Sequence, residues 1–357
     1  MIPGSPPIGR YAADVARPAR DPVLRGAAGA GSGATRRGRR RRARCYAAPV
    51  SWPLLVIGFA LLVAGGDVLV RGAVALAARL NVSPLVVGLT VVAFGTSAPE
   101  LASTVAAALR GAPELGIGNV LGSNVANVAL ILGAAALLAP IGRNEAFVRR
   151  DLPVGLAATA LLPLLALDGT LGRLDGAVLL ALLGTYLAVL AWTDRGKVRA
   201  QAEAAPDAGP WRAAGIAAIG IGLLVLGAEA TVRGAVEIAT AWGVSERVIG
   251  LTIVAFGTSL PELASSVAAA VRRQGDLVLG NIAGSNVFNV LAVLGATAAT
   301  TRLPVRPGPL AVDAGLAIAA SLLLLPFLLL GGRLGRGAGV TLLAAYAAYL
   351  AWAFVAG

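Results

Sequence analysis

The sequence predicts an all-α polytopic membrane protein, with ten transmembrane helices in two inverted-topology repeats of five, preceded by a disordered basic tail. Three observations support this fold class. The chain of 357 residues is 57% hydrophobic and only 13% charged, roughly half the charged fraction of a soluble domain. Its apolar part divides into stretches long enough to cross a bilayer. The first half of that part also resembles the second half in sequence.

The tail, residues 1–50, is set apart by its charge, with 11 Arg against 2 Asp. It lacks the interleaved aromatic residues and the folded module of a nucleic-acid-binding protein, so nucleic acid is not expected as a partner. Attachment to anionic lipid and plain disorder are the alternatives. The first 30 residues contain no apolar region with a cleavage site, so no cleavable signal peptide is predicted. Met1 is the only methionine and Val50 directly precedes the first apolar segment, so we expect the natural chain to begin near Val50.

Residue usage excludes several kinds of chemistry. The chain has no His, and its one Cys, Cys45, lies in the tail. Histidine acid–base catalysis, histidine zinc sites, haem ligation and an intrachain disulfide are therefore excluded. Because nothing resembles a nucleophile–base pair either, we expect neither an enzyme nor a permanently bound cofactor.

Ten mostly apolar stretches are candidates for membrane helices. The longest polar interval divides them five and five, which predicts a first repeat at 51–193, a cytoplasmic linker at 194–211 and a second repeat at 212–357. The ten predicted segments are 52–78, 84–109, 115–139, 152–167, 174–193, 212–238, 246–271, 277–299, 309–330 and 338–356.

An internal duplication is the most informative feature of the chain. Residues 88–109 match residues 250–271 at 18 of 22 positions, with an offset of 162 that also relates Asp67 to Glu229. Because each unit has an odd number of helices, the second copy must enter the membrane from the opposite side, as in many secondary transporters.

Loop charge predicts the orientation. With the linker in the cytoplasm, 13 Lys and Arg residues of the body lie inside and 6 lie outside. Cytoplasmic loops are enriched in such residues, so both ends of the body are predicted outside and the membrane is predicted to be the cell inner (plasma) membrane.

The second helix of each repeat contains Gly-Thr-Ser-x-Pro-Glu, at residues 95–100 and 257–262. Proline removes a backbone donor, so carbonyls near residues 93–96 and 255–258 are expected to lose partners. A carboxylate at this depth costs at least ~2.5 kcal/mol, which packing does not explain for Glu100 or Glu262. Carbonyls, hydroxyls and carboxylates together suit Na⁺ or Ca²⁺.

The third helix of each repeat contains Gly-Ser-Asn-x-x-Asn, at residues 122–127 and 284–289. The Ser and the last Asn are four residues apart, so both share one helix face and can offer neutral oxygens to a cation. The motif glycines are better explained by close helix packing. Helix-to-helix hydrogen bonding is an adequate explanation for four further asparagines: Asn119, Asn124, Asn281 and Asn286.

Asp67 and Glu229 each precede an Arg by four residues, Arg71 and Arg233. This spacing predicts local structural ion pairs near a helix end.

The paired GTSxPE and GNxxGSNxxN motifs resemble those of the sodium/calcium exchanger family of cation/calcium antiporters, over about residues 52–356. The resemblance implies a carrier that exchanges Na⁺ for Ca²⁺, so that both ions are transported substrates and the lipid bilayer is its surroundings. We expect it to act as a monomer.

The resemblance also assigns ligands. Glu100 and Glu262, with the carbonyls of Thr96 and Thr258, would form the Ca²⁺ site. The other positions would complete flanking Na⁺ sites and the centre: Ser97, Ser123, Ser259, Ser285, the carbonyls of Ala93 and Ala255, and centrally Asn127 and Asn289. In the potassium-dependent branch an Asp at the position of Asn289 accompanies K⁺ cotransport, so Asn here argues against K⁺ dependence.

The charge of the site suggests a mechanism. With only the two glutamates ionised, the empty site carries −2, and one Ca²⁺ or several Na⁺ compensate this charge. The empty carrier should therefore switch slowly, which gives obligatory exchange. A Ca²⁺/H⁺ antiporter using the same glutamates is the main alternative. A cation channel, which would conduct without a counter-ion, fits an inverted repeat less well.

Overall fold

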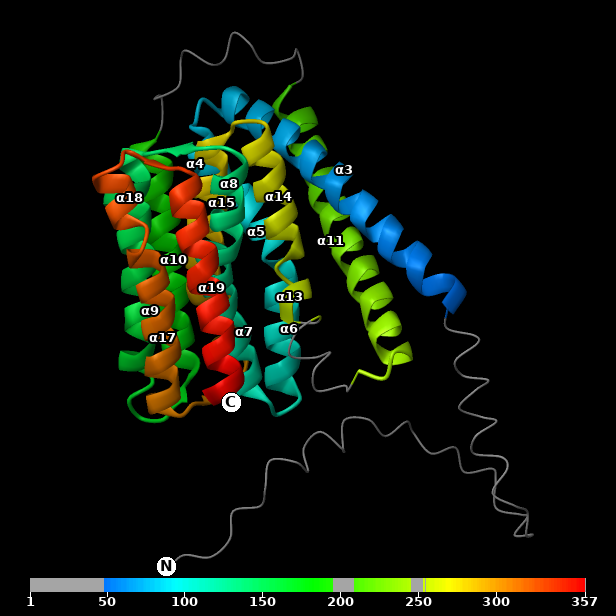
Figure 1. Cartoon of the computed structure of the whole chain (residues 1–357). Helices are drawn as coiled ribbons and strands as arrows, with labels where there is room; N and C mark the ends of the chain where they lie inside the picture. The colour runs from blue at the N-terminus through cyan, green and yellow to red at the C-terminus, as the bar shows by residue number, and fades with distance from the viewer. Residues whose placement is uncertain (1–47, 195–208, 245–252, 254, 357) are drawn as a thin grey trace, which may run out of the picture. The chain divides into compact units, whose positions relative to one another are not determined.

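The computed structural model describes residues 48–194, 209–244, 253 and 255–356, and helices make up almost all of these described residues (Figure 1). Residues 1–47 of the predicted tail, most of the predicted linker and the start of the segment at 246–271 lie outside the described residues.

The predicted first repeat begins with one long helix, α3, and continues through four groups of helices separated by short turns. The elements are α3 (Ala48–Leu80); α4 (Pro84–Val87), η2 (Gly88–Val92), α5 (Ala93–Thr96) and α6 (Ala98–Leu109); α7 (Pro113–Ala126), η3 (Asn127–Leu132) and α8 (Gly133–Leu138); η4 (Phe147–Asp151) and α9 (Leu152–Leu165); and α10 (Arg173–Thr193).

The predicted second repeat follows the same order where it is described. Its elements are α11 (Pro210–Ala241); α13 (Ala255–Gly257) and α14 (Leu260–Val271); α15 (Gly275–Phe288), η7 (Asn289–Leu294) and α16 (Gly295–Thr300); α17 (Pro307–Leu322) and α18 (Leu325–Leu329); and α19 (Arg336–Ala356). The η elements are π-helical turns, and η3 and η7 start at positions that differ by the offset of the sequence repeat.

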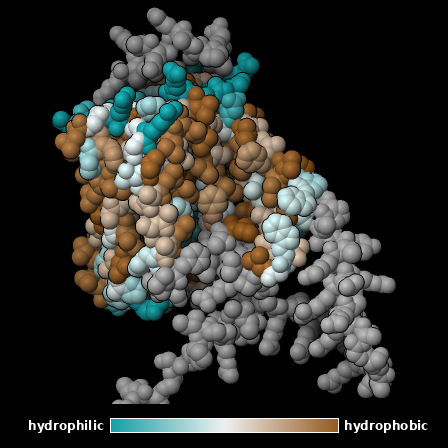
Figure 2. Space-filling view, viewed as in Figure 1, coloured by the Kyte–Doolittle hydropathy of each residue, from teal (hydrophilic) through white to brown (hydrophobic). Residues whose placement is uncertain are grey.

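Six of the described helices are long and apolar enough to cross a membrane, or seven when the bent pair Pro84–Thr96 and Ala98–Leu109 counts as one span. Figure 2 shows apolar side chains over the visible flank of the molecule and hydrophilic ones gathered at its two ends. Large apolar side chains are exposed on the surface of the described residues, among them Phe59, Leu174 and Leu330. An apolar belt of this kind is the surface that a bilayer requires, so the protein is an integral membrane protein.

Two central helices carry the core. The apolar windows of Pro113–Leu138 and Gly275–Thr300 are 78% and 89% buried, whereas those of the other candidate spans are at most 33% buried. These two helices contain the predicted Gly-Ser-Asn-x-x-Asn motifs. The candidate ligands on them therefore sit in the interior of the bundle.

Helices α3 and α11 lie side by side along most of their length (Figure 1). Glycines recur every seven residues on both helices and let the backbones approach closely: Gly58, Gly65 and Gly72 on α3, and Gly220, Gly227 and Gly234 on α11. A Cβ atom at Gly220 would lie 2.4 Å from the backbone nitrogen of Leu69, so only hydrogen fits there.

Two short antiparallel strand pairs join the halves of the chain at their loops. β1 (Ile141–Gly142) pairs with β4 (Arg333–Leu334), with Ile141 opposite Leu334. β2 (Thr170–Leu171) pairs with β3 (Leu303–Pro304), with Leu171 opposite Leu303.

The packing of the two halves is not symmetric around α6 and α14. Helix α3 packs on α14, where a Cβ atom at Gly66 would lie 2.9 Å from the carbonyl oxygen of Ala264. Arg272, at the end of α14, donates from Nε to Asp67 of α3 at 2.7 Å. Six residues of α14 are buried, compared with two of the equivalent α6. Among the described helices, α14 is thus more deeply covered than its equivalent α6.

Candidate cation site

Two broken helices bring the predicted carboxylates into the interior. The chain leaves helical geometry at Ser97 (φ −83°, ψ 7°) and at Ser259 (φ −88°, ψ 4°), just before α6 and α14. Pro99 and Pro261 stand in the first turns of these helices, where a missing N–H is tolerated. Each glutamate follows its proline directly, so it begins a new helix in mid-bundle.

The two carboxylates are held by serines of the opposite half of the chain. Ser97 donates from Oγ to Oε1 of Glu262 at 3.0 Å. Ser259 donates from Oγ to Oε1 of Glu100 at 3.5 Å. Both glutamates are only 1% exposed. Within the described part of the chain neither has a basic partner, so their charge calls for a counter-ion.

Six buried side-chain oxygens of the described residues have no hydrogen-bond partner: Oε2 of Glu100, Oε2 of Glu262, Oγ of Ser285, Oδ1 of Asn127, Oδ1 of Asn289 and Oγ1 of Thr104. Leaving one such group unpaired costs about 1–3 kcal/mol. The first five belong to residues that the sequence predicts as ligands, whereas Thr104, one turn after Glu100 on α6, was not predicted. Carboxylate, hydroxyl and amide oxygens of this kind are the ligands that Na⁺ and Ca²⁺ take.

The remaining predicted side chains lie in the same interior region. Ser123 is buried on α7, and its Oγ lies 3.4 Å from Oγ of Ser259. Thr96 is buried on α5 and donates to the carbonyl of Val92 at 3.1 Å. Thr258 lies in the turn between α13 and α14.

The expectation that the Ala93 carbonyl loses its partner is wrong. That carbonyl accepts from the Ser97 backbone nitrogen at 2.9 Å, because α5 extends to Thr96 before the chain bends. In the other half, the Ser259 nitrogen bonds the Phe256 carbonyl at 3.1 Å. Ala255 begins α13, and its side chain lies outside the described residues.

The predicted local ion pairs are present, but they lie within long helices and not near a helix end. Asp67 pairs with Arg71 at 2.7 Å, and Glu229 pairs with Arg233 at 2.5 Å. Asp67 also pairs with Arg272, a partner that the sequence did not indicate.

Asn281 contacts both halves of the chain, a role that its sequence motif did not predict. Its Nδ2 donates to Ser265 at 3.1 Å and to Ser266 at 2.9 Å, and its Oδ1 accepts from Thr96 at 3.4 Å. The equivalent Asn119 donates only to Ser103, at 3.2 Å, among the bonds of the described residues. The GNxxGSN motif located both asparagines, but it does not indicate which one joins the two halves.

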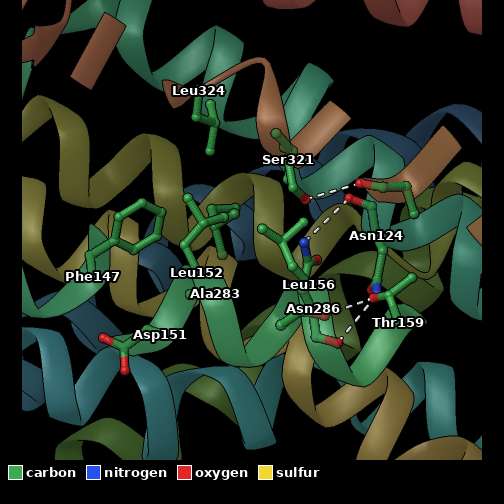
Figure 3. Close-up of a pocket in the computed structure, with 14 residues that line it drawn as sticks. Asn124, Phe147, Asp151, Leu152, Leu156, Thr159, Ala283, Asn286, Ser321 and Leu324 are labelled. Atoms are coloured by element: carbon green, nitrogen blue, oxygen red, sulfur yellow. Dashed lines mark hydrogen bonds between the residues drawn. The ribbon is translucent and has the colours of Figure 1, made fainter. Parts of the chain in front are cut away.

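A small cavity of about 20 Å³ lies behind the central helices. Figure 3 shows Asn124, Asn286, Thr159 and Ser321 gathered at one end of it, with Phe147 and Asp151 at the other. The end of the cavity that Thr159 and Ser321 line therefore adjoins the asparagines of the two central helices.

The described residues contain no group of three or more His, Cys, Asp or Glu that could hold a metal ion. A cation in this interior would therefore rely on two carboxylates and otherwise neutral oxygens.

Comparison with known proteins matches nearly the whole helical part of the chain. The family model described as "Sodium/calcium exchanger protein" matches residues 50–192 and 212–355. The sodium/calcium exchanger MaX1 of Methanosarcina acetivorans is 35% identical over 341 residues, covering 84% of this chain and 97% of that protein. The inner membrane protein YrbG of Escherichia coli is 35% identical over 312 residues, covering 84% and 95%.

A solved structure of the sodium-calcium exchanger NCX_Mj, soaked with 10 mM Na⁺ and zero Ca²⁺, superposes with a TM-score of 0.76 at 34% identity. It covers 85% of this chain and 98% of that one. The similarity thus extends over the fold and not only over the motifs.

Proposed function

Because the chain belongs to the sodium/calcium exchanger family, we propose that it is a secondary active antiporter that exchanges Na⁺ for Ca²⁺ by alternating access. The observation that carries the proposal is the pair of buried glutamates, each held by a serine from the other half and each with one unpartnered oxygen. Such a pair is unfavourable when empty and matches the charge of one Ca²⁺.

In this proposal Glu100 and Glu262, with the carbonyls of Thr96 and Thr258, bind Ca²⁺. The four serines, with the carbonyls of Ala93 and Ala255, complete flanking sites for Na⁺, and Asn127 and Asn289 occupy the centre between the repeats. The unpartnered Oγ of Ser285 and Oδ1 atoms of Asn127 and Asn289 support this assignment. Both central residues are Asn, so we infer that K⁺ is not a substrate.

The charge of the site explains obligatory exchange. The empty site carries −2, and moving it through a low-dielectric barrier is unfavourable until cations neutralise it. If three Na⁺ replace one Ca²⁺, each cycle moves one net charge. Each 100 mV of membrane potential then adds about 2.3 kcal/mol to the driving force. With Na⁺ high outside, this favours Ca²⁺ export.

We further propose that the helices form ten spans in two inverted repeats, acting as a monomer in the cell inner membrane. The equivalent starts of η3 and η7 support two structural repeats. The equivalent breaks at Ser97 and Ser259 support them too. The loop charges support a cytoplasmic central linker, with both ends of the helical body outside.

The test is uptake of radioactive Ca²⁺ into proteoliposomes loaded with Na⁺, compared with vesicles loaded with choline at matched pH. We expect uptake that requires internal Na⁺ and is lost in Glu262→Gln. Glu229→Gln is the matched control, because this glutamate is exposed and paired with Arg233 of its own helix. Uptake driven by a pH step and indifferent to Na⁺ would favour the Ca²⁺/H⁺ antiporter, and uptake without any counter-ion would favour a channel.

A further inference from the structure

Asn124 and Asn286 close a hydrogen-bonded ring between the two central helices, and the central asparagines Asn289 and Asn127 each donate to one of them. Asn124 and Asn127 come from α7 and the start of η3, and Asn286 and Asn289 come from α15 and the start of η7. Asn289 donates from Nδ2 to Oδ1 of Asn124 at 3.0 Å. Asn127 donates from Nδ2 to Oδ1 of Asn286 at 2.9 Å.

Backbone carbonyls fix the direction of every amide in this ring. Asn124 donates from Nδ2 to the backbone carbonyl of Asn286 at 3.2 Å. Asn286 donates from Nδ2 to the backbone carbonyl of Asn124 at 3.5 Å. A carbonyl can only accept, so the NH₂ of each of these two side chains must face it. Their Oδ1 atoms then face the other repeat's central asparagine, which in turn must present its own NH₂.

The central asparagines consequently leave their oxygens free. Oδ1 of Asn127 and Oδ1 of Asn289 are buried without a partner, and both residues are about 1% exposed. Asn127 shares a helix face with Ser123, whose Oγ lies 3.4 Å from the Oγ of Ser259, the residue that donates to Glu100. Asn127 therefore lies on the helix face that meets the glutamate site.

We propose that Asn124 and Asn286 are positioning residues, each of which orients the central asparagine of the other repeat so that its oxygen, and not its NH₂, is offered to the transported cation. The inference rests on the proposed cation site and adds to it two residues that hold the central amides. Each of them acts across the boundary between the halves of the chain.

Neighbouring hydroxyls leave the ring undisturbed. Thr159 and Ser321 line the cavity beside Asn124 and Asn286 (Figure 3). Thr159 donates to the carbonyl of Gly155 at 2.9 Å, and Ser321 donates to the carbonyl of Ala317 at 3.0 Å. Because each hydroxyl has one proton and gives it to its own helix, neither competes as a donor for Oδ1 of Asn124 or Asn286.

The ring also specifies a neutral centre. An ionised Asp at position 289 would place a carboxylate oxygen against Oδ1 of Asn124, with no proton between them. Asn124 cannot turn to compensate, because its NH₂ would leave the carbonyl of Asn286 and its oxygen would face that carbonyl. The ring therefore favours a neutral donor at both central positions, and the negative charge of the site stays on the two glutamates.

The experiment is equilibrium Ca²⁺ binding to purified full-length protein, with melting temperature as a check on folding. Asn124→Leu and Asn289→Ala are each expected to weaken Ca²⁺ binding roughly tenfold, the scale of one hydrogen-bond-strength contact to a charge. The double variant should bind about as weakly as either single one, because both changes remove the same oriented oxygen.

The control double variant combines Asn124→Leu with Asn127→Ala, because Asn127 is held by Asn286 and not by Asn124. The two losses of Ca²⁺ affinity should multiply to about a hundredfold, as for independent sites. Asn119→Leu, outside the ring, should leave binding within about twofold of wild type. If Asn124→Leu does not fold, Asn124→Ser serves in the same two pairings, since a hydroxyl there is too short to reach Asn289.

If the losses of Ca²⁺ affinity multiply equally in the double variants with Asn289→Ala and with Asn127→Ala, the proposal is wrong and Asn124 only links the two helices. Absence of Ca²⁺ binding in the wild type would overturn it as well. If Ca²⁺ binds with the expected coupling but Na⁺-dependent uptake is absent, the positioning role stands and the exchange function fails.

Discussion

The close approach of α3 and α11 gives the sharpest stability prediction. A Cβ atom at Gly220 would lie 2.4 Å from the backbone nitrogen and 2.5 Å from Cα of Leu69. Both atoms are backbone, so no side chain can move aside, and the helices must separate locally. Overpacking of this kind costs about 1–3 kcal/mol. Replacing a helical Gly by Ala otherwise gains roughly 0.5–1 kcal/mol, so Gly220→Ala should destabilise by about 1–2 kcal/mol net.

Gly222 provides the control on the same helix. A Cβ atom there would have no neighbour within 4 Å, so Gly222→Ala should stabilise by the propensity gain alone. The assay is thermal unfolding of both variants in the same detergent, read as a difference in apparent melting temperature at one heating rate. A lower midpoint for Gly220→Ala and an equal or higher one for Gly222→Ala is expected. Equal midpoints would refute the claim that backbone contact at Gly220 holds the pair together.

Two further predictions concern other polar groups. Ser97→Ala removes the 3.0 Å hydrogen bond to Glu262, so the Na⁺ concentration for half-maximal Ca²⁺ uptake should rise roughly tenfold. The control Ser103→Ala loses a hydrogen bond to the Glu100 carbonyl of its own helix and should change this concentration less than about twofold. Equal effects of the two substitutions would contradict the proposed site. Burial raises the pKa of Asp151 above its usual value, while the Arg150 guanidinium at 2.6 Å opposes this rise. A raised carboxyl pKa means that the folded state binds the proton more tightly, so the Asp151 contribution to stability falls as pH rises. In Arg150→Gln the pKa of Asp151 should rise further. The melting temperature of this variant should therefore be lower than that of the wild type at pH 7 and approach it as the pH is lowered toward 5. A difference in melting temperature that does not change with pH would show that Arg150 does not offset the burial of Asp151.

Sequence spacing was sufficient to locate the candidate site. Pro99 and Pro261 predicted where the helices break, because proline removes a backbone donor. Spacings of three and four residues predicted which polar groups share a helix face, and the internal repeat predicted that two such faces meet. The hydrogen bonds that Ser97 and Ser259 make across the halves agree with this reasoning.

Contacts between segments far apart in the chain could not be predicted from the spacing of residues. Periodicity places Asn124 on a face, but it does not say which way an amide points, since that depends on carbonyls of another helix. Arg272 and Arg150 look like ordinary loop cations in sequence. Their distant partners Asp67 and Thr193 become visible only once the helix ends are placed. Strands of two residues, such as β1, carry no periodic pattern at all.

The unequal cover of α6 and α14 bears on the conformational balance of the proposed carrier. The two halves are related by a sequence repeat, so the balance between mirror-related arrangements depends on the positions where they differ. Gly66 lets α3 reach the backbone of α14, whereas its counterpart in the repeat is Ala228. Under the proposed inverted topology, α11 would have to accommodate that extra methyl group to cover α6. Taken alone, a penalty of about 1–3 kcal/mol there would keep the mirror arrangement a minor population, roughly 1–15%, for bound ions to shift. This methyl group would thus be one of the differences between the halves that favour one direction of opening of the empty site.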